Sequence, residues 1–98
     1  MGGAEPKFDW DDANRDHLAR HHVRPEEAEQ AVLDPHAIFV DIEVRGDDDE
    51  ERTTTVGMTA SGRVLAVVFT VRGEAVRPIT AYAAPARLEA LYFEQRRL

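Results

Sequence analysis

The chain has 98 residues and no cysteine, so it is long enough for one hydrophobic core and excludes disulfide and thiolate chemistry. Hydrophobic residues make up 43% and charged residues 32%, as in ordinary soluble proteins, and no apolar run approaches the roughly 20 residues that a transmembrane helix needs. We expect no membrane insertion, a cytoplasmic location, a disordered tail over residues 1–7 and a single domain over residues 8–98.

The net charge of −7 disfavours direct DNA binding by this chain alone, because proteins that bind many phosphates usually carry an excess of positive charge. Acidic residues crowd the stretch 41–51. The second half carries arginines with few acids between them: Arg63, Arg72, Arg77, Arg87, Arg96 and Arg97. This asymmetry fits a solvated acidic turn, a basic face on an acidic protein, or an acidic loop that attracts a basic partner.

Two helices are predicted before any strand. Asp11 or Asp12 can cap the first one, over about 11–21, because a carboxylate accepts hydrogen bonds from the free amides of the first turn. A proline followed by two glutamates at 25–27 opens the second helix, and the Asp-Pro pair at 34–35 ends it.

The first two predicted strands flank the acidic stretch. Residues 36–44 alternate with a period of two, which is typical of a strand with one buried face. The residues that this pattern places on the buried face are Ile38, Val40, Ile42 and Val44. Residues 52–59 are rich in threonine and valine, which favour a half-buried strand.

The last two strands and a helix complete the predicted fold. Residues 64–69 are apolar on both faces, which places them in the middle of a sheet. In the fourth strand, 76–82, Pro78 must sit at an edge, a bulge or an outward position because it has no amide donor. A helix opens at Pro85. The fold class is therefore α+β, with two N-terminal helices, a four-stranded antiparallel meander and a C-terminal helix.

Three groups of residues, in order along the chain, carry a family resemblance. The first is Phe8-Asp9-Trp10-Asp11, Asn14, His17-Leu18, Arg20-His21, Val23 and Pro25-Glu26-Glu27-Ala28. The second is Gly57, Gly62-Arg63-Val64-Leu65 and Val67-Val68-Phe69-Thr70. The third is Arg72-Gly73, Val76-Arg77-Pro78-Ile79-Thr80-Ala81-Tyr82 and a terminal helix with Arg87, Glu89 and Tyr92. Together they resemble the BrnT family of bacterial type II toxins, small ribonucleases with a RelE-like fold.

The resemblance implies an RNA-cleaving toxin that uses neither a metal nor another cofactor. It also implies a cognate antitoxin, of the ribbon-helix-helix type and BrnA-like, that silences the toxin and binds operator DNA. The chain would then meet RNA directly as its substrate and DNA only through the antitoxin. A homodimer is left open.

The candidate acid and base are two histidines of the first helix. Asn14, His17 and His21 lie at i, i+3 and i+7, so they share one face of that helix. Imidazoles titrate near neutral pH and both donate and accept protons. Metal-free RNA cleavage needs one group to take the proton of the 2′-hydroxyl and another to protonate the leaving 5′-oxygen, and His17 and His21 are our candidates.

The candidate cations are two arginines of the closing hairpin. Arg72 and Arg77 can clamp a phosphate, because guanidinium is always charged and offers a fork that matches two phosphate oxygens. A tight turn between them would bring both to one phosphate if the register allows. Tyr82 is a third candidate, to stack on a base or donate a proton.

Each candidate has a structural alternative. The histidines can hydrogen-bond a carbonyl and a carboxylate to hold helix and sheet together, and the arginines can pair with Glu89 or Glu94. We expect Asn14 to cap or bridge backbone, and Trp10 to anchor the core. The spacing of His17 and His21 also occurs in zinc sites, but Arg20 lies between them and the glutamate of a metalloprotease helix is missing, so we predict no metal site.

Two functions remain. The first is an endoribonuclease toxin. The alternative is a catalytically decayed BrnT-like module that binds an antitoxin or another protein. The net charge of −7 favours the alternative, as does Tyr82, where many members of the family have arginine.

Overall fold

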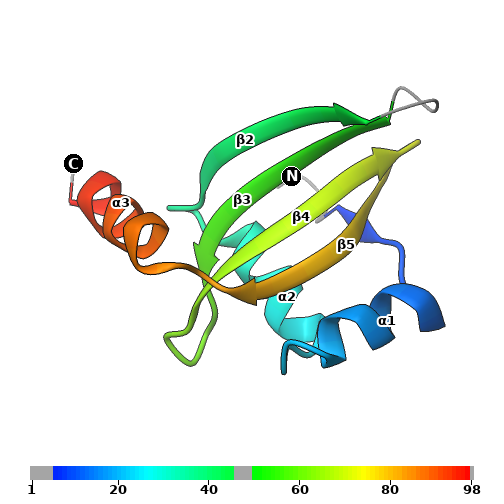
Figure 1. Ribbon diagram of the computed structural model, residues 1–98, viewed down its shortest axis with the longest axis horizontal. Helices are drawn as coiled ribbons and strands as arrows, with labels where there is room; N and C mark the ends of the chain where they lie inside the picture. Colours follow the sequence, from blue (N-terminus) through cyan, green and yellow to red (C-terminus); the bar gives the residue numbers. More distant parts are fainter. Residues whose placement is uncertain (1–5, 46–49, 98) are drawn as a thin grey trace, which may run out of the picture.

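The computed structural model describes residues 6–45 and 50–97 and shows an α+β fold with three helices and one mixed sheet (Figure 1). The sheet has five strands in the order β1-β5-β4-β3-β2. The elements are β1 (Lys7–Phe8), α1 (Asp12–Ala19), α2 (Pro25–Leu33), β2 (Ile38–Arg45), β3 (Glu50–Met58), β4 (Val64–Arg72), β5 (Ala75–Ala83) and α3 (Ala86–Arg96). Within the described residues, no helix is long and apolar enough to span a bilayer.

The sheet differs from the predicted four-stranded meander by one short strand. Strands β2 to β5 are antiparallel neighbours as predicted, but β1 pairs with β5 in parallel, with Lys7 opposite Ala75 and Phe8 opposite Val76. Two residues are too few to show an alternating pattern, so the sequence gives no signal for β1. Lys7, the end of the expected tail, is part of this strand. Residues 1–5 of that tail lie outside the described residues, and so do 46–49 of the acidic stretch.

The side-chain amide of Asn14 connects helix α1 to the sheet. Asp11 caps the helix as predicted, because its carboxylate accepts the Asn14 amide while the Asn14 side chain accepts the Asp11 amide. The Asn14 Nδ2 then donates to the carbonyl oxygens of Asp9 and Pro78, both at 2.9 Å. The expected structural role of Asn14 is confirmed, and these bonds fix α1 beside β5 (Figure 1).

The chain leaves α1 through a tight left-handed turn at His22. Its φ is +60°, its amide donates to Ala19, and the amide of Val23 donates to Leu18, which is the pattern of a Schellman motif. The carbonyl oxygen of His22 accepts a hydrogen bond from the Arg63 guanidinium at 3.0 Å. This turn ends the helix before His21, so the predicted end at residue 21 is late by two residues.

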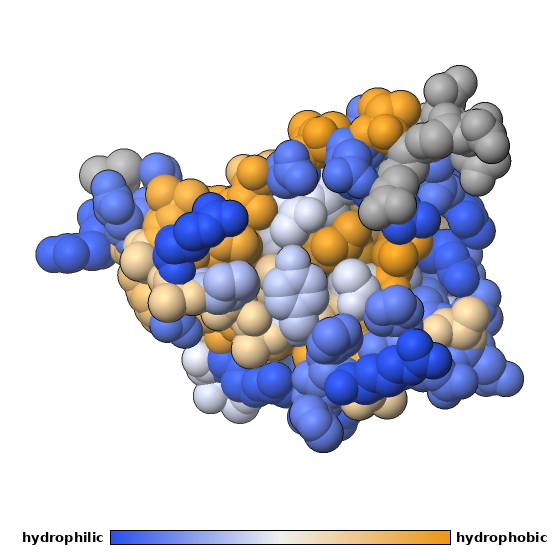
Figure 2. All heavy atoms as spheres, viewed as in Figure 1, coloured by the Kyte–Doolittle hydropathy of each residue, from blue (hydrophilic) through white to orange (hydrophobic). Residues whose placement is uncertain are grey.

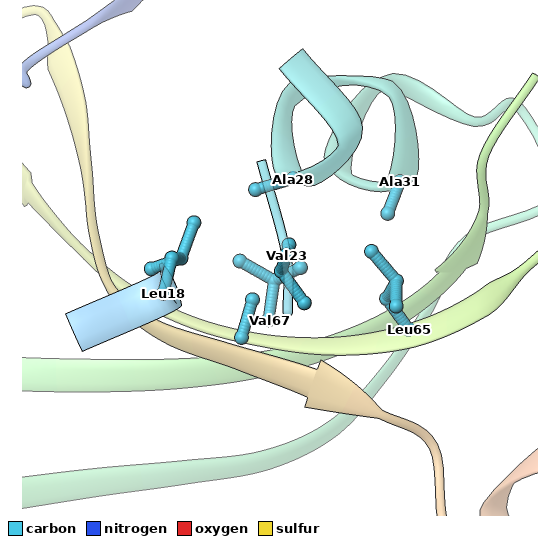
Figure 3. Packing of buried hydrophobic residues seen from close by; sticks show 7 residues of the cluster. Leu18, Val23, Ala28, Ala31, Leu65 and Val67 are labelled. Atoms are coloured by element: carbon cyan, nitrogen blue, oxygen red, sulfur yellow. The ribbon is translucent and has the colours of Figure 1, made fainter. Parts of the chain in front are cut away.

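The main core lies between the sheet and the first two helices (Figure 3). Helix α2 approaches β3 so closely that a Cβ at Gly57 would lie 1.9 Å from the carbonyl oxygen of Ala31. Trp10 packs against this core and its indole donates to Glu29 at 2.8 Å, which confirms its predicted anchoring role. The buried members of the core are Leu18, Val23, Ala28, Ala31, Leu65, Val67 and Ala81.

Strand β2 corrects the predicted burial of residues 36–44. Phe39 pairs with Thr55 and Asp41 with Thr54, so Val40 is an extra residue that forms a bulge. Because side chains alternate between faces, one extra residue moves all later side chains to the opposite face. Ile42 and Val44, expected inside, are therefore 61% and 62% exposed.

Strand β5 contains a second bulge, and here the sequence-based prediction is confirmed. Phe69 pairs with Pro78 and Val68 with Thr80, which leaves Ile79 as the extra residue. Pro78 thus lies next to a bulge, one of the positions predicted for a residue without an amide donor.

Helix α3 covers only one end of the other face of the sheet. Leu88 and Tyr92 pack there against Val56, Val64 and Ala66. The Tyr92 hydroxyl donates to the carboxylate of Asp34, which follows α2. No helix of the described residues lies on the rest of this face, which we call the open face, and polar side chains mix there with apolar ones (Figure 2).

Candidate active site on the β5 edge

Two unpartnered imidazoles form the middle of the candidate site. His17 projects from the last turn of α1 and His21 from the turn that follows, and their ring centroids are 6.1 Å apart. Both side chains are exposed, and across residues 6–45 and 50–97 neither makes a hydrogen bond or an ion pair. The structural alternative, in which they hold helix and sheet together by hydrogen bonds, is therefore not what the structure shows.

Tyr82, on strand β5 of the sheet, lies next to His21. Its ring centroid lies 6.0 Å from that of His21, with the ring planes inclined by 57°. Tyr82 is half-buried near the end of β5, and its hydroxyl has no hydrogen-bond partner within the described chain. The structure thus brings together His17, His21 and Tyr82, and a fourth predicted site residue, Arg77, lies next to His17.

Arg77 lies on the other side of His17, and its guanidinium forms ion pairs with the carboxylates of Asp9 and Asp11. It shares a shallow hollow with Asn14 and His17. Its guanidinium lies 2.9 Å from Asp11 and 3.5 Å from Asp9, and its side chain is only 13% exposed. The pKa of Asp11 is lowered, first by the hydrogen bond from the Asn14 amide and further by Arg77. The partners are thus residues before α1, not the predicted Glu89 or Glu94.

Arg72 does not join the site. It lies at the far end of β4, opposite Ala75, and its guanidinium binds Glu50 on β3 at 3.2 Å. Tyr82 is opposite Ala66, six residues back along β4, which is about 20 Å at 3.3 Å per residue. The hairpin register places both predicted phosphate clamps on the same face of the sheet, because Arg77 is opposite Thr70, two residues before Arg72. Their carboxylate partners hold them apart: Arg72 binds Glu50 on β3, and Arg77 binds Asp9 and Asp11 before α1.

A different arginine lies beside Tyr82. Arg87, in the first turn of α3, lines a groove together with Tyr82 and Thr54 on the open face of the sheet. It is exposed and has no ion pair within the described residues. Sequence reasoning passed over it as a site residue. A signal was present, because Pro85 ends the strand and starts the helix only three residues after Tyr82, which forces Arg87 close to the end of β5.

These side chains form one continuous line, which we call the β5-edge site: Arg77, His17, His21, Tyr82 and Arg87. It carries two imidazoles and a phenol at its centre and a guanidinium at each end. Among the described residues, no cluster of three or more histidine, aspartate or glutamate side chains is arranged to hold a metal ion.

A comparison with protein families identifies the chain. The model of the family described as ribonuclease toxin, BrnT, of type II toxin-antitoxin system matches residues 10–87. The chain belongs to this family. The match contains every residue of the β5-edge site, with Arg87 at its last position. The comparison with curated proteins gave no match.

Membership of the BrnT family confirms the resemblance read from the sequence and gives the β5-edge site a chemical context. A BrnT toxin is a ribonuclease toxin that belongs to a pair with an antitoxin. Proton transfer at the oxygens of a phosphodiester requires accessible side chains that can act as an acid or a base, and imidazole is a side chain of this kind. Cations beside them can stabilise the charge that develops on phosphorus oxygens.

Proposed function

We propose that this chain is a metal-independent endoribonuclease toxin that acts in the cytoplasm, and that a cognate antitoxin neutralises it. One observation carries the proposal: two exposed, unpartnered imidazoles lie 6.1 Å apart beside a tyrosine, in a chain of a ribonuclease toxin family. A BrnA-like antitoxin with a DNA-binding domain would link the pair to operator DNA, which the toxin itself does not contact.

The proposed reaction is an internal transesterification of RNA. One imidazole takes the proton of the 2′-hydroxyl, whose oxygen attacks phosphorus, while the bond from phosphorus to the 5′-oxygen breaks. The other imidazole, in its protonated form, gives a proton to that 5′-oxygen. The products are a 2′,3′-cyclic phosphate and a 5′-hydroxyl. The ring centroids of His17 and His21 are 6.1 Å apart, so that the two imidazoles can lie on either side of one phosphate.

Arg87 and Tyr82 have supporting roles in this proposal. Arg87 is the exposed guanidinium of the site and binds the phosphate that is attacked or the next one along the strand. Tyr82 offers a ring face on which an unpaired base stacks. Arg77 holds the start of α1 through Asp9 and Asp11, and so keeps His17 in place beside its hollow.

The test is cleavage of RNA by the purified chain, free of antitoxin, in the presence of EDTA. His17→Ala and His21→Ala should each slow cleavage by about 10²–10⁴-fold, because each removes one proton-transfer group. His36→Ala is the matched control, since His36 is exposed between α2 and β2 and lies outside the β5-edge site. Equal rates for all three variants would refute the assignment.

The alternative function, a decayed module that only binds a partner, also has an observation in its favour. Arg72 and Arg77, the two cations expected to bind phosphate, are each paired with carboxylates. Under this alternative the wild-type chain leaves RNA intact and does not arrest bacterial growth when induced, but still binds its antitoxin. Growth arrest that the His21→Ala variant loses would exclude it.

A further inference from the structure

Strand β2 forms an edge of the sheet and presents large, exposed apolar side chains on one of its two faces. It is the last strand in the order β1-β5-β4-β3-β2. Phe39, Ile42 and Val44 are 72%, 61% and 62% exposed. Proteins usually protect an edge strand with charged side chains, prolines or a covering element, because its free backbone groups pair readily with another chain.

These apolar residues share one face of the sheet. Phe39 is opposite Thr55, which is opposite Val67 of the main core, so this row lies on the side of α1 and α2. Ile42 and Val44 follow on the same side beyond the bulge, and Val71 of β4, which is 60% exposed, lies on that side as well. We call these four residues the β2 patch: Phe39, Ile42, Val44 and Val71. Helices α1 and α2 cover the other end of this face, and no helix of the described residues covers the patch.

The opposite side of β2 is acidic. In the register of β2 and β3, Asp41 is opposite Thr54 and Glu43 is opposite Arg52. Both acidic side chains lie on the open face of the sheet, where they line a shallow hollow. The edge therefore has an apolar side and an acidic side, which alternate residue by residue over Asp41–Val44. A strand that pairs with this edge would complement it if its own residues alternated between apolar and basic.

We propose that the antitoxin neutralises this chain by adding such a strand to β2. The occupant is an extended segment whose apolar side chains cover the β2 patch and whose lysines or arginines face Asp41 and Glu43. Main-chain hydrogen bonds to β2 supply affinity, and the alternation of side chains supplies specificity. This inference rests on the proposed pairing with an antitoxin, and it deepens it by naming the surface and the chemistry of the partner.

Charge distinguishes this partner from a second copy of the same chain. Another copy would bring its own Asp41 and Glu43 to the edge, together with a further net charge of −7. Like charges directly opposite each other in a sheet are destabilising, and a high net charge keeps chains apart. RNA is disfavoured at this edge for the same reason, so a basic peptide segment is the occupant that fits both sides.

The experiment measures binding of the antitoxin, taken as the product of the reading frame adjacent to that of this chain, by titration calorimetry. The test variant is the double substitution Ile42→Ser with Val44→Ser. The matched control is Leu91→Ser with Phe93→Ser on α3, where both side chains are exposed but far along the chain from β2. The dissociation constant should rise at least tenfold for the β2 variant and change less than twofold for the control.

Two further measurements test the same surface without relying on the Ile42→Ser, Val44→Ser variant, which could lose binding by failing to fold. Asp41→Asn with Glu43→Gln should weaken binding at low salt and reduce its dependence on salt, because these carboxylates attract the basic side of the segment. In the wild-type chain, backbone amides of β2 should become protected from hydrogen exchange when the antitoxin binds. Wild-type affinity in the Ile42→Ser, Val44→Ser variant, or protection confined to α1 and β5, would overturn the proposal.

The remaining outcomes separate this inference from the proposed function. If the free wild-type chain cleaves RNA but the β2 variant binds antitoxin normally, the inference fails and the function stands. If the chain leaves RNA intact but antitoxin binding requires β2, the inference stands and the function fails. A chain that binds no antitoxin, or one in which the β2 substitutions abolish self-association and leave antitoxin binding unchanged, also overturns the inference.

Discussion

Removing one hydroxyl group, by Tyr92→Phe, should weaken the attachment of α3 to the rest of the domain. The Tyr92 side chain is fully buried, and its hydroxyl donates to Asp34 and accepts from Arg96 at 3.5 Å. Asp34 also accepts the backbone amides of His36 at 2.9 Å and Met58 at 2.8 Å. This carboxylate therefore joins α2, β3 and α3 in one network.

The expected loss in the free energy of unfolding is about 2 kcal/mol at neutral pH, because a hydrogen bond to a charged group contributes about 1.5–3 kcal/mol. For a domain of this length that is a fall of about 8–16 °C in the melting temperature. Tyr82→Phe makes the same chemical change where the hydroxyl has no partner within the described chain. It should change stability by less than about 0.5 kcal/mol.

The cost of Tyr92→Phe should also depend on pH. Burial raises the pKa of Asp34, but the hydrogen bonds from Tyr92, His36 and Met58 outweigh it and leave the pKa below its usual value. A group with a lowered pKa in the folded state adds stability above its unfolded pKa and loses it as the pH falls through the folded pKa. The difference between wild type and Tyr92→Phe should therefore be full at pH 7 and shrink below about pH 4.

Urea unfolding of the wild type, Tyr92→Phe and Tyr82→Phe at pH 7, 5 and 3.5 measures both effects. Equal stability for the two phenylalanine variants would refute the role of the Asp34 network. A loss of the same size at every pH would show that packing around the ring, and not the bond to the carboxylate, holds α3.

Two further substitutions probe the core and the site. Gly57→Ala should lower the free energy of unfolding by about 1–3 kcal/mol or more, because its Cβ would lie 1.9 Å from the Ala31 carbonyl oxygen and α2 would have to move; an unchanged urea midpoint would contradict this close approach. Arg87→Ala should slow RNA cleavage at least tenfold while Arg72→Ala leaves it within about twofold, because Arg87 lies beside Tyr82 and Arg72 binds Glu50. The reverse order in a cleavage assay would place the phosphate on the far side of the hairpin.

The sequence predicts features that depend on neighbouring residues along the chain. The cap at Asp11, the start of α2 at Pro25 and the irregular position of Pro78 each follow from the backbone chemistry of one residue, and each is found. Helical spacing also predicts that His17 and His21 lie close together, which is found, although His21 lies in the turn after α1 and not in the helix. Family membership was also readable, because its residues recur in a fixed order.

The features that the sequence does not predict depend on contacts between distant segments. The bulge at Val40 is set by pairing with β3, and it reverses the side on which Ile42 and Val44 lie. The pairing of Arg77 with Asp9 and Asp11 depends on the position of β1 beside β5. The alternation of residues within one strand carries no information about either contact. The exposed β2 patch, and the presence of Arg87 instead of Arg72 in the β5-edge site, are therefore known only from the structure.

The most direct test of the β5-edge site is whether cleavage at one phosphodiester of RNA requires the neighbouring 2′-hydroxyl. After the cut site of the antitoxin-free chain is mapped, a substrate with a single 2′-deoxy sugar at that site is incubated beside the all-ribose substrate in EDTA. We expect the all-ribose RNA to be cut to a 2′,3′-cyclic phosphate and a 5′-hydroxyl while the deoxy substrate stays intact, since its nucleophile is missing. Cleavage of the deoxy substrate, or no cleavage of the all-ribose RNA until a divalent metal is added, would contradict it.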